Sequence, residues 1–322
     1  MSPHYFAARA LLVCALLYPA LAPCADLLDT PAAPSALAQH ALINGLAHAG
    51  SRVVAVGQRG HILYSDNQGG NWSQAKVPLS TDLTAVFFPT PRDGWAVGHD
   101  GVILHSTDAG ATWAVQLDQR KIDKALGADP SFLDVWFRDA QNGFAVGAFN
   151  LIMATTDGGR SWTSWSKQTD NPDGYHLNAI RALGEDVYIA GEHGVLLRLA
   201  ADGSRFEALK SPYQGSFFGI TGQPGALIAH GLRGNAWRSA DRGASWQRID
   251  TGINTGLTAS AAGGAGIVLL SQAGQVLLST DAGLHFAPVK HKPGPVSAAL
   301  LSGGQLVVGG ARGLRALPLA PQ

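Results

Sequence analysis

The sequence has few charged residues, no net charge and no long apolar run, and each of these absences excludes a class of protein. Charged residues make up 14% of the 322 residues, and the 23 basic and 23 acidic side chains cancel. The chain therefore lacks the basic excess with which proteins bind nucleic acid or anionic lipid. Its most conspicuous apolar run, residues 10–17, is too short to cross a bilayer. We expect no nucleic-acid partner and no membrane span.

The first 25 residues have the pattern of a secretory signal peptide. Arg9 precedes the apolar run, small residues continue to Ala25, and polar sequence begins at Asp26. Cleavage after Cys24 or after Ala25 is compatible with this pattern. Residues 21–24 also resemble a lipoprotein box in which Cys24 would carry the lipid, although Pro23 fits that motif poorly. We expect export to a bacterial periplasm, with a lipid anchor as the less favoured alternative.

Beyond this leader the chain has no cysteine and much glycine. Cys14 and Cys24 are the two cysteines, so the mature chain forms no disulfide in an oxidising compartment. The 40 glycines, together with the low charge, favour a β-rich chain with many tight turns.

A repeat of 39 to 49 residues runs through the mature chain. Each copy has a Gly-x-x-Gly pair, with Asn150 and Ser271 as single departures from glycine. Five residues after the second position of this pair, most copies open a Ser/Thr-x-Asp-x-Gly-x-x-Trp turn. A constant internal offset with variable outer spacing indicates a fixed hairpin unit joined by adjustable loops. The first positions are Gly57, Gly98, Gly147, Gly191, Gly231, Ser271 and Gly310.

Each unit reads as four strands with alternating apolar residues, which predicts the blade of a β-propeller. The Gly-x-x-Gly pair forms the turn between the second and third strands, and the Asp turn joins the third and fourth. We therefore predict an all-β fold: a single seven-bladed propeller over residues 26–322, after a leader at residues 1–25. The last unit stops after three strands, and we expect residues 26–30 to supply its fourth strand and close the ring.

The Asp turn is the Asp-box, also called the BNR repeat. Because these turns lie spread around the rim, their carboxylates cannot converge for catalysis, and we interpret them as structural. The residues so assigned are Asp108, Trp113, Asp157, Trp162, Asp241, Trp246 and Asp281.

The fuller pattern of the repeat resembles the photosystem II stability/assembly factor propellers. An apolar strand, then Gly-x-Ala-Val-Gly-x-x-Gly-x-Ile-Leu, then the Asp-box, carries this resemblance over residues 26–317. The resemblance implies a non-enzymatic scaffold that holds membrane proteins during assembly in a lumen or periplasm. In a bacterium without photosynthesis the client would be another membrane complex, for which an RND-type exporter is one candidate.

No constellation in the sequence indicates an enzyme. The three glutamates, Glu185, Glu192 and Glu207, are not placed with a tyrosine and an arginine cluster, as a sialidase requires. The histidines lack the spacing of metal ligands, so we expect neither a metal nor a cofactor. The alternative is a carbohydrate-active glycosidase or lyase, which would need Asp100, Glu192 and His193 to converge in one pocket.

Strand direction places the Gly-x-x-Gly turns and the connections between blades on one face, opposite the Asp-boxes. Repeat proteins usually bind partners where insertions gather on one face. The two longest connections belong to it: residues 118–127, which read as a short amphipathic helix, and residues 167–175. We expect a monomer that binds a membrane-protein complex or another periplasmic protein there. The predicted contact residues are Arg59, His99, Asp100, Phe149, Glu192, His193, Arg233, Arg312, Arg120 and Lys121.

Overall fold

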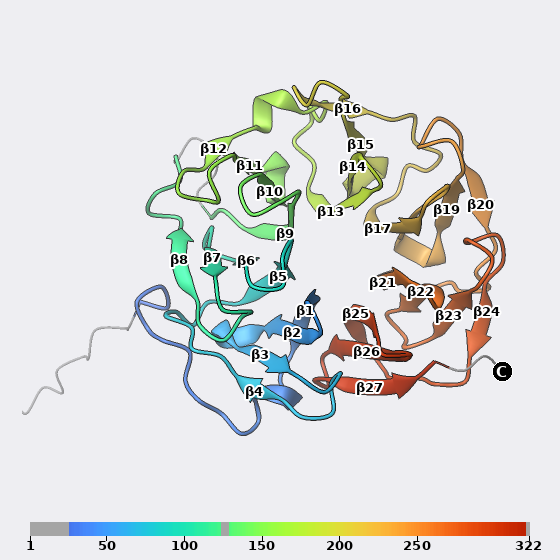
Figure 1. Cartoon of the computed structure of the whole chain (residues 1–322). Coiled ribbons are helices and arrows are strands. Elements are labelled where there is room, and N and C mark those ends of the chain that lie inside the picture. The colour runs from blue at the N-terminus through green and yellow to red at the C-terminus, as the bar shows by residue number, and fades with distance from the viewer. Residues whose placement is uncertain (1–25, 124–128, 320–322) are drawn as a thin grey trace, which may run out of the picture.

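The computed structural model describes residues 26–123 and 129–319. These residues form a ring of seven antiparallel sheets, with the first strand of each sheet nearest the axis and the last at the rim (Figure 1). The prediction of an all-β, seven-bladed propeller is therefore confirmed. The predicted leader lies outside the described residues.

The strands follow the order of the repeat, four to a blade in six blades of the described chain. Blade 1 contains β1 (Ile43–Ala49), β2 (Arg52–Gly57), β3 (Ile62–Ser65) and β4 (Ser73–Gln74), and blade 2 contains β5 (Leu83–Phe87), β6 (Gly94–Gly98), β7 (Ile103–Ser106) and β8 (Ala114–Leu117). Blade 3 contains β9 (Phe132–Phe137), β10 (Gly143–Gly147), β11 (Ile152–Thr155) and β12 (Thr163–Ser164), and blade 4 contains β13 (Leu177–Leu183), β14 (Asp186–Gly191), β15 (Leu196–Leu199) and β16 (Phe206–Ala208). Blade 5 contains β17 (Phe217–Gln223), β18 (Ala226–Gly231), β19 (Ala236–Ser239) and β20 (Gln247–Ile249), and blade 6 contains β21 (Leu257–Gly263), β22 (Gly266–Ser271), β23 (Val276–Ser279) and β24 (Ala287–Val289). Blade 7 contains β25 (Val296–Ser302), β26 (Gln305–Gly310) and β27 (Arg315–Pro318).

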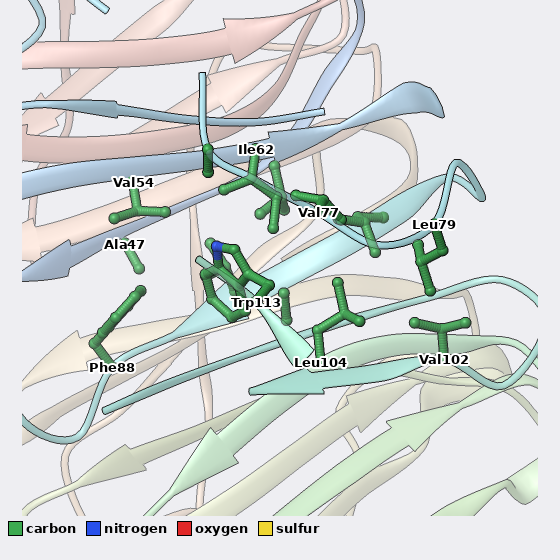
Figure 2. Close-up of a cluster of buried hydrophobic side chains, with 14 of the residues drawn as sticks. Ala47, Val54, Ile62, Val77, Leu79, Phe88, Val102, Leu104 and Trp113 are labelled. Atoms are coloured by element: carbon green, nitrogen blue, oxygen red, sulfur yellow. The ribbon is translucent and has the colours of Figure 1, made fainter. Parts of the chain in front are cut away.

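The core consists of the interfaces between neighbouring blades. The second strands β6, β18 and β22 are buried along their whole length, because each blade is covered on both faces by its neighbours. Figure 2 shows one such interface, where Val54 and Ile62 of blade 1 face Leu104 and Trp113 of blade 2. A face of a sheet that no neighbour covered would expose this apolar surface to water.

The first strands are also joined by hydrogen bonds from one blade to the next. Near the start of β1, Asn44 Nδ2 donates to the carbonyl of Leu83 at 2.9 Å, and Thr84 Oγ1 donates onward to the carbonyl of Phe132 at 2.8 Å. The same arrangement recurs from Asn178 to Phe217 and from Thr258 to Val296, at 2.7 Å each. These bonds satisfy backbone carbonyls beside the central channel and tie the blades in register.

The Gly-x-x-Gly turn uses its two glycines for different reasons. The first has an extended backbone, with φ −165° at Gly57, and a Cβ there would lie 2.0 Å from the carbonyl oxygen of Leu42. It therefore permits a close approach of the segment that enters the first strand. The second glycine has positive φ, +67° at Gly60, which avoids the steric cost that a side chain meets there.

The expected closure of blade 7 by residues 26–30 is wrong. Among the described residues the last sheet has three strands, and none comes from this segment. Residues 26–30 instead form a turn, in which the Asp26 carboxylate accepts from Leu28 N and its carbonyl from Asp29 N. Leu28 is buried against the interface of blades 1 and 2, and Leu27 O accepts from Ser80 N. Asp26 thus starts a local turn, and Leu28 finds its apolar partners away from blade 7.

The ring closes instead where residues 39–40 cross the last turn of blade 7. Leu314 N donates to the carbonyl of Gln39 at 2.9 Å, and His48 Nε2 is 2.9 Å from the carbonyl oxygen of Leu301. At the open edge of β27, Arg315 and Pro318 are exposed. A charged residue and a residue without an N–H at such an edge discourage pairing with another strand.

The crossing at Gly313 predicts a test of closure with a matched control. A Cβ on Gly313 (φ +76°) would lie 2.2 Å from Gln39 O and 2.5 Å from His40 Cα, whereas Gly304 (φ +77°) has nothing within 4 Å. Gly304→Ala should cost about 1–2 kcal/mol, the price of the left-handed backbone alone. Gly313→Ala should cost about 3 kcal/mol or more, because two backbone segments must also move apart. Urea unfolding of both variants checks this, and equal losses would contradict closure at this point.

Candidate functional site

The two faces of the ring carry different turns. The antiparallel order places the Gly-x-x-Gly turns and the entries to the first strands at one end of every blade. The Asp-boxes and the turns between first and second strands lie at the other end. We call the face with the Gly-x-x-Gly turns the turn face, and the face with the Asp-boxes the Asp-box face.

The third residue of the Gly-x-x-Gly turn adopts the left-handed conformation in five blades, with φ between +50° and +57°. Side chains therefore occur at equivalent positions around the turn face, exposed in four of these blades and half-buried at Asp100. Their chemistry divides by blade: the residues are basic in blades 1 and 5, whereas blades 2 to 4 carry an acid, an aromatic residue and a histidine. They are Arg59, Asp100, Phe149, His193 and Arg233.

Two of the predicted contact residues in blade 2 are held by the protein itself. His99 Nδ1 lies 2.7 Å from Ser131 Oγ, and the carboxylate of Asp100 accepts a hydrogen bond from Thr81 Oγ1. By contrast, within the described residues the guanidinium groups of Arg59, Arg233 and Arg312 make no hydrogen bond or ion pair, and all three residues are exposed.

Arg120 and Lys121 also contact their own chain. Arg120 binds the buried carboxylate of Asp118 through its backbone N and guanidinium, and its Nη1 lies 3.0 Å from Asp29 Oδ1. Lys121 Nζ donates to the carbonyl of Gln116 at 3.4 Å. Residues 118–123 form a turn rather than the start of the expected helix, and residues 124–128 lie outside the described residues. Arg120 therefore joins the N-terminal segment to blade 2.

An aromatic cluster lies on the turn face between blades 3 and 4. Phe149 is 75% exposed, and its ring meets that of His176 edge-on, with centroids 4.5 Å apart. Tyr175 stacks on His193 with centroids 4.4 Å apart, and Glu192 Oε2 accepts from His176 N at 3.2 Å. Phe149, Glu192 and His193 were predicted as contact residues from the sequence, whereas Tyr175 and His176 were not. A signal was present, because Tyr175 ends the long connection at residues 167–175 and His176 follows it.

The Asp-box carboxylates make hydrogen bonds within their own turns. Asp108 Oδ1 accepts from Ser106 Oγ and Thr112 N at 2.9 Å each, and Oδ2 accepts from Thr112 Oγ1 at 2.7 Å. Such donors lower the pKa of Asp157 and of Asp241 to about 2, with the hydroxyls of Ser161 and Ser245 as the largest cause. The equivalent carboxylate, Asp281, accepts from His285 N and Nδ1.

The aromatic positions of the boxes pack between blades. Trp113 is buried and donates from Nε1 to the carbonyl of Gly110 at 3.0 Å, and Trp162 meets Phe137 edge-on. Trp246 packs against the cluster that contains Tyr188. In blade 1, for which no Asp-box residue was predicted, Asn67 takes the place of the Asp and accepts from Asn71 N at 2.8 Å.

The residues required by a carbohydrate-active enzyme do not come together. Asp100 belongs to blade 2, whereas Glu192 and His193 belong to blade 4, with blade 3 between them. None of the three lines the central channel or the cavity beside blades 3 and 4. Within residues 26–123 and 129–319, no group of three His, Cys, Asp or Glu could hold a metal ion. No helix in the same residues is long and apolar enough to cross a bilayer.

The central channel encloses about 440 Å³ and is lined by the first strands. Arg181, the one arginine among the described residues that line it, pairs with the buried carboxylate of Asp134, which also accepts from Ile180 N at 2.9 Å. His230 joins blades 5 and 6, because its Nδ1–H donates to the carbonyl of Leu257 at 3.0 Å and Nε2 accepts from Ser260 Oγ at 2.8 Å. His230 thereby makes the bond between blades that an asparagine or threonine makes at the junctions described above. Burial lowers the pKa of His230 to about 4.

The fold and the repeat define a seven-bladed β-propeller with BNR repeats. A family model described as photosynthesis system II assembly factor YCF48 matches residues 116–265. A solved structure described as YCF48 bound to D1 peptide is similar at a TM-score of 0.70 and 18% identity, covering 88% of this chain and 95% of that one. YCF48 from Cyanidioschyzon merolae gives 0.69 and 14%, covering 87% and 96%. The WD40 propeller domain of Doa1 gives 0.68 and 10%, covering 90% and 95%.

No curated protein matches the chain. The family match and the two YCF48 structures show that the chain resembles the photosystem II assembly-factor propellers. The similarity to the Doa1 domain shows the fold alone.

The junction at His230 predicts a pH dependence of stability. The pKa of about 4 in the folded chain lies below the ordinary value of 6.5, so the unfolded chain binds more protons between these values. Stability should therefore fall as pH decreases from about 6.5 to 4, by at most ~1.4 kcal/mol per pH unit from this group. His230→Asn should flatten that slope in urea unfolding, leaving the part due to His61 and His105, whose pKa values burial also lowers. The control variant is His291→Asn, which changes a half-buried histidine outside this junction. An unchanged slope in His230→Asn would contradict the assignment.

Proposed function

We propose that this chain is a non-enzymatic periplasmic scaffold that binds a membrane-protein complex through the turn face and assists its assembly or stability. The observation that carries the proposal is the resemblance to the assembly-factor propellers, one of which is described as bound to a D1 peptide. The fold adds support, since a propeller offers a wide rigid face on which turns from every blade are displayed.

The turn face has the chemistry of a protein-binding surface. Arg59, Arg233 and Arg312 are exposed, and no described side chain engages their guanidinium groups. Free arginines can bind the carboxylates of a partner in pairs of hydrogen bonds, and arginine is enriched among the residues that dominate interface energies. On the Asp-box face, in contrast, the box carboxylates are already bonded within their own turns.

The arginines predict a loss of client binding on charge reversal. The double variant Arg59→Glu, Arg233→Glu should capture its membrane-protein client from detergent extracts at least about 10-fold less well, because two favourable charge contacts become repulsive. Arg160→Glu reverses one charge on the exposed Asp-box turn of blade 3 and should capture normally. Cross-linking in cells followed by mass spectrometry names the client, with an RND-type exporter as one candidate. Normal capture by the double variant would show that another surface binds.

The leader predicts the compartment. Protein recovered from the periplasm should lack the first 24 or 25 residues, since small residues precede both cleavage positions. The intact mass of the mature chain distinguishes the two sites, and a lipid mass on Cys24 would show the anchored alternative. A full-length chain in the cytoplasm would contradict export.

A further inference from the structure

The aromatic cluster between blades 3 and 4 has a feature that stability does not explain. Phe149 has φ +52° and ψ +46°, a conformation that is costly for a bulky side chain, and its ring is 75% exposed. A strained backbone lowers stability and an exposed aromatic ring adds little to it, and strained residues are concentrated at sites that bind. The equivalent turn positions in the neighbouring blades carry polar residues, Asp100 and His193.

The loop that supports the cluster is fixed by Asn150, the residue that departs from the Gly-x-x-Gly pattern. Asn150 Nδ2 donates to Ser166 O at 3.0 Å, and Oδ1 accepts from Thr169 Oγ1 at 3.0 Å and from Asn171 Nδ2 at 3.1 Å. Its backbone N donates to the carbonyl of Tyr175 at 3.2 Å. Thr169 and Asn171 are buried. The cluster is therefore organised before any partner arrives, which reduces the entropy lost on binding.

Glu192 supplies an available negative charge beside the aromatic rings. Its Oε2 lies 3.6 Å from His176 Nδ1, but that nitrogen accepts a hydrogen bond from Phe149 N at 3.0 Å and so carries no proton. The imidazole therefore does not pair with the carboxylate. The Glu192 side chain is 35% exposed and has no other cationic partner among the described residues.

We infer that Phe149 and Glu192 form a docking site for an arginine or lysine side chain of a partner protein. A cation is attracted to the face of an aromatic ring and to a carboxylate, whereas an anionic ligand would be repelled by this pair. His176 contacts both groups, because its ring centroid is 4.5 Å from that of Phe149 and its Nδ1 is 3.6 Å from Glu192 Oε2. The inference rests on the proposed function. It places a basic residue of the partner opposite blades 3 and 4, whereas the arginines of blades 1, 5 and 7 would face carboxylates of the partner.

The site can be tested first with small probes. In NMR titrations with the acetylated and amidated tripeptide Gly-Arg-Gly, the resonances of Phe149 and its neighbours should shift. The peptide with citrulline in place of arginine, which is neutral and of the same shape, should leave them unshifted. Phe149→Asn should abolish the shift while keeping the fold, because asparagine tolerates this backbone conformation. Glu192→Gln should weaken it at least several-fold while preserving an acceptor for His176 N. Equal shifts with both peptides, or shifts unaffected by either variant, would overturn the site.

A second experiment separates this inference from the proposed function. Client capture should fall several-fold in Phe149→Asn and in Glu192→Gln, while the melting temperature of Phe149→Asn equals or exceeds that of the wild type. If capture is lost only in the Arg59 and Arg233 double variant, the turn face binds the client but the aromatic cluster does not, and the inference is wrong. If all these variants capture normally, both proposals fail.

Discussion

Burial of each blade by its two neighbours is the constraint on which the structure depends. A blade has two large faces, and the second strands β6, β18 and β22 are buried throughout, so no blade can cover its own apolar surface. The stability of every interface therefore requires that the ring be closed. Here the chain closes it by packing and by the contacts of Gln39 and His48 with blade 7, and within residues 26–123 and 129–319 no strand is exchanged between the first and last blades.

The local motifs were sufficient to predict the fold, because a propeller repeats one short-range pattern. The Gly-x-x-Gly turn and the Asp-box lie within one hairpin each, and their spacing needs no tertiary information. The failed prediction at residues 26–30 required a choice between two distant partners. Polar residues in Asp-Leu-Leu-Asp-Thr favour a turn, but the burial of Leu28 between blades 1 and 2 is a contact that the sequence does not reveal. The same holds for Arg120, whose partner Asp29 is 91 residues away.

The candidate site shows the same division between local and distant information. The left-handed positions of Arg59, Phe149 and Arg233 follow from the turn motif, and their exposure follows from the face on which the turn lies. In the sequence, Asn150 stood out only because it occupies the second glycine position of the Gly-x-x-Gly turn. Its role depends on four residues of the following loop, and that loop has no repeat to define it. Irregular connections carry the features that distinguish this propeller from others, and they are the parts least determined by the repeat.

Blade 4 shows which part of the Asp-box the ring requires. Its turn places Ala201 where the boxes of blades 2, 3, 5 and 6 have the acidic residue, and the described hydrogen bonds of the Asp202 carboxylate, one position later, go to Ser204. A Cβ added at Gly203 would have nothing within 4 Å, and a cavity of about 770 Å³ opens beside the turn. Yet Phe206, in place of the tryptophan, is fully buried against Phe144 and Trp165. The aromatic side chain that fills the space between blades is thus retained where the carboxylate is lost. Packing between blades, rather than the hydrogen bonds of the turn, is what the closed ring demands of this motif.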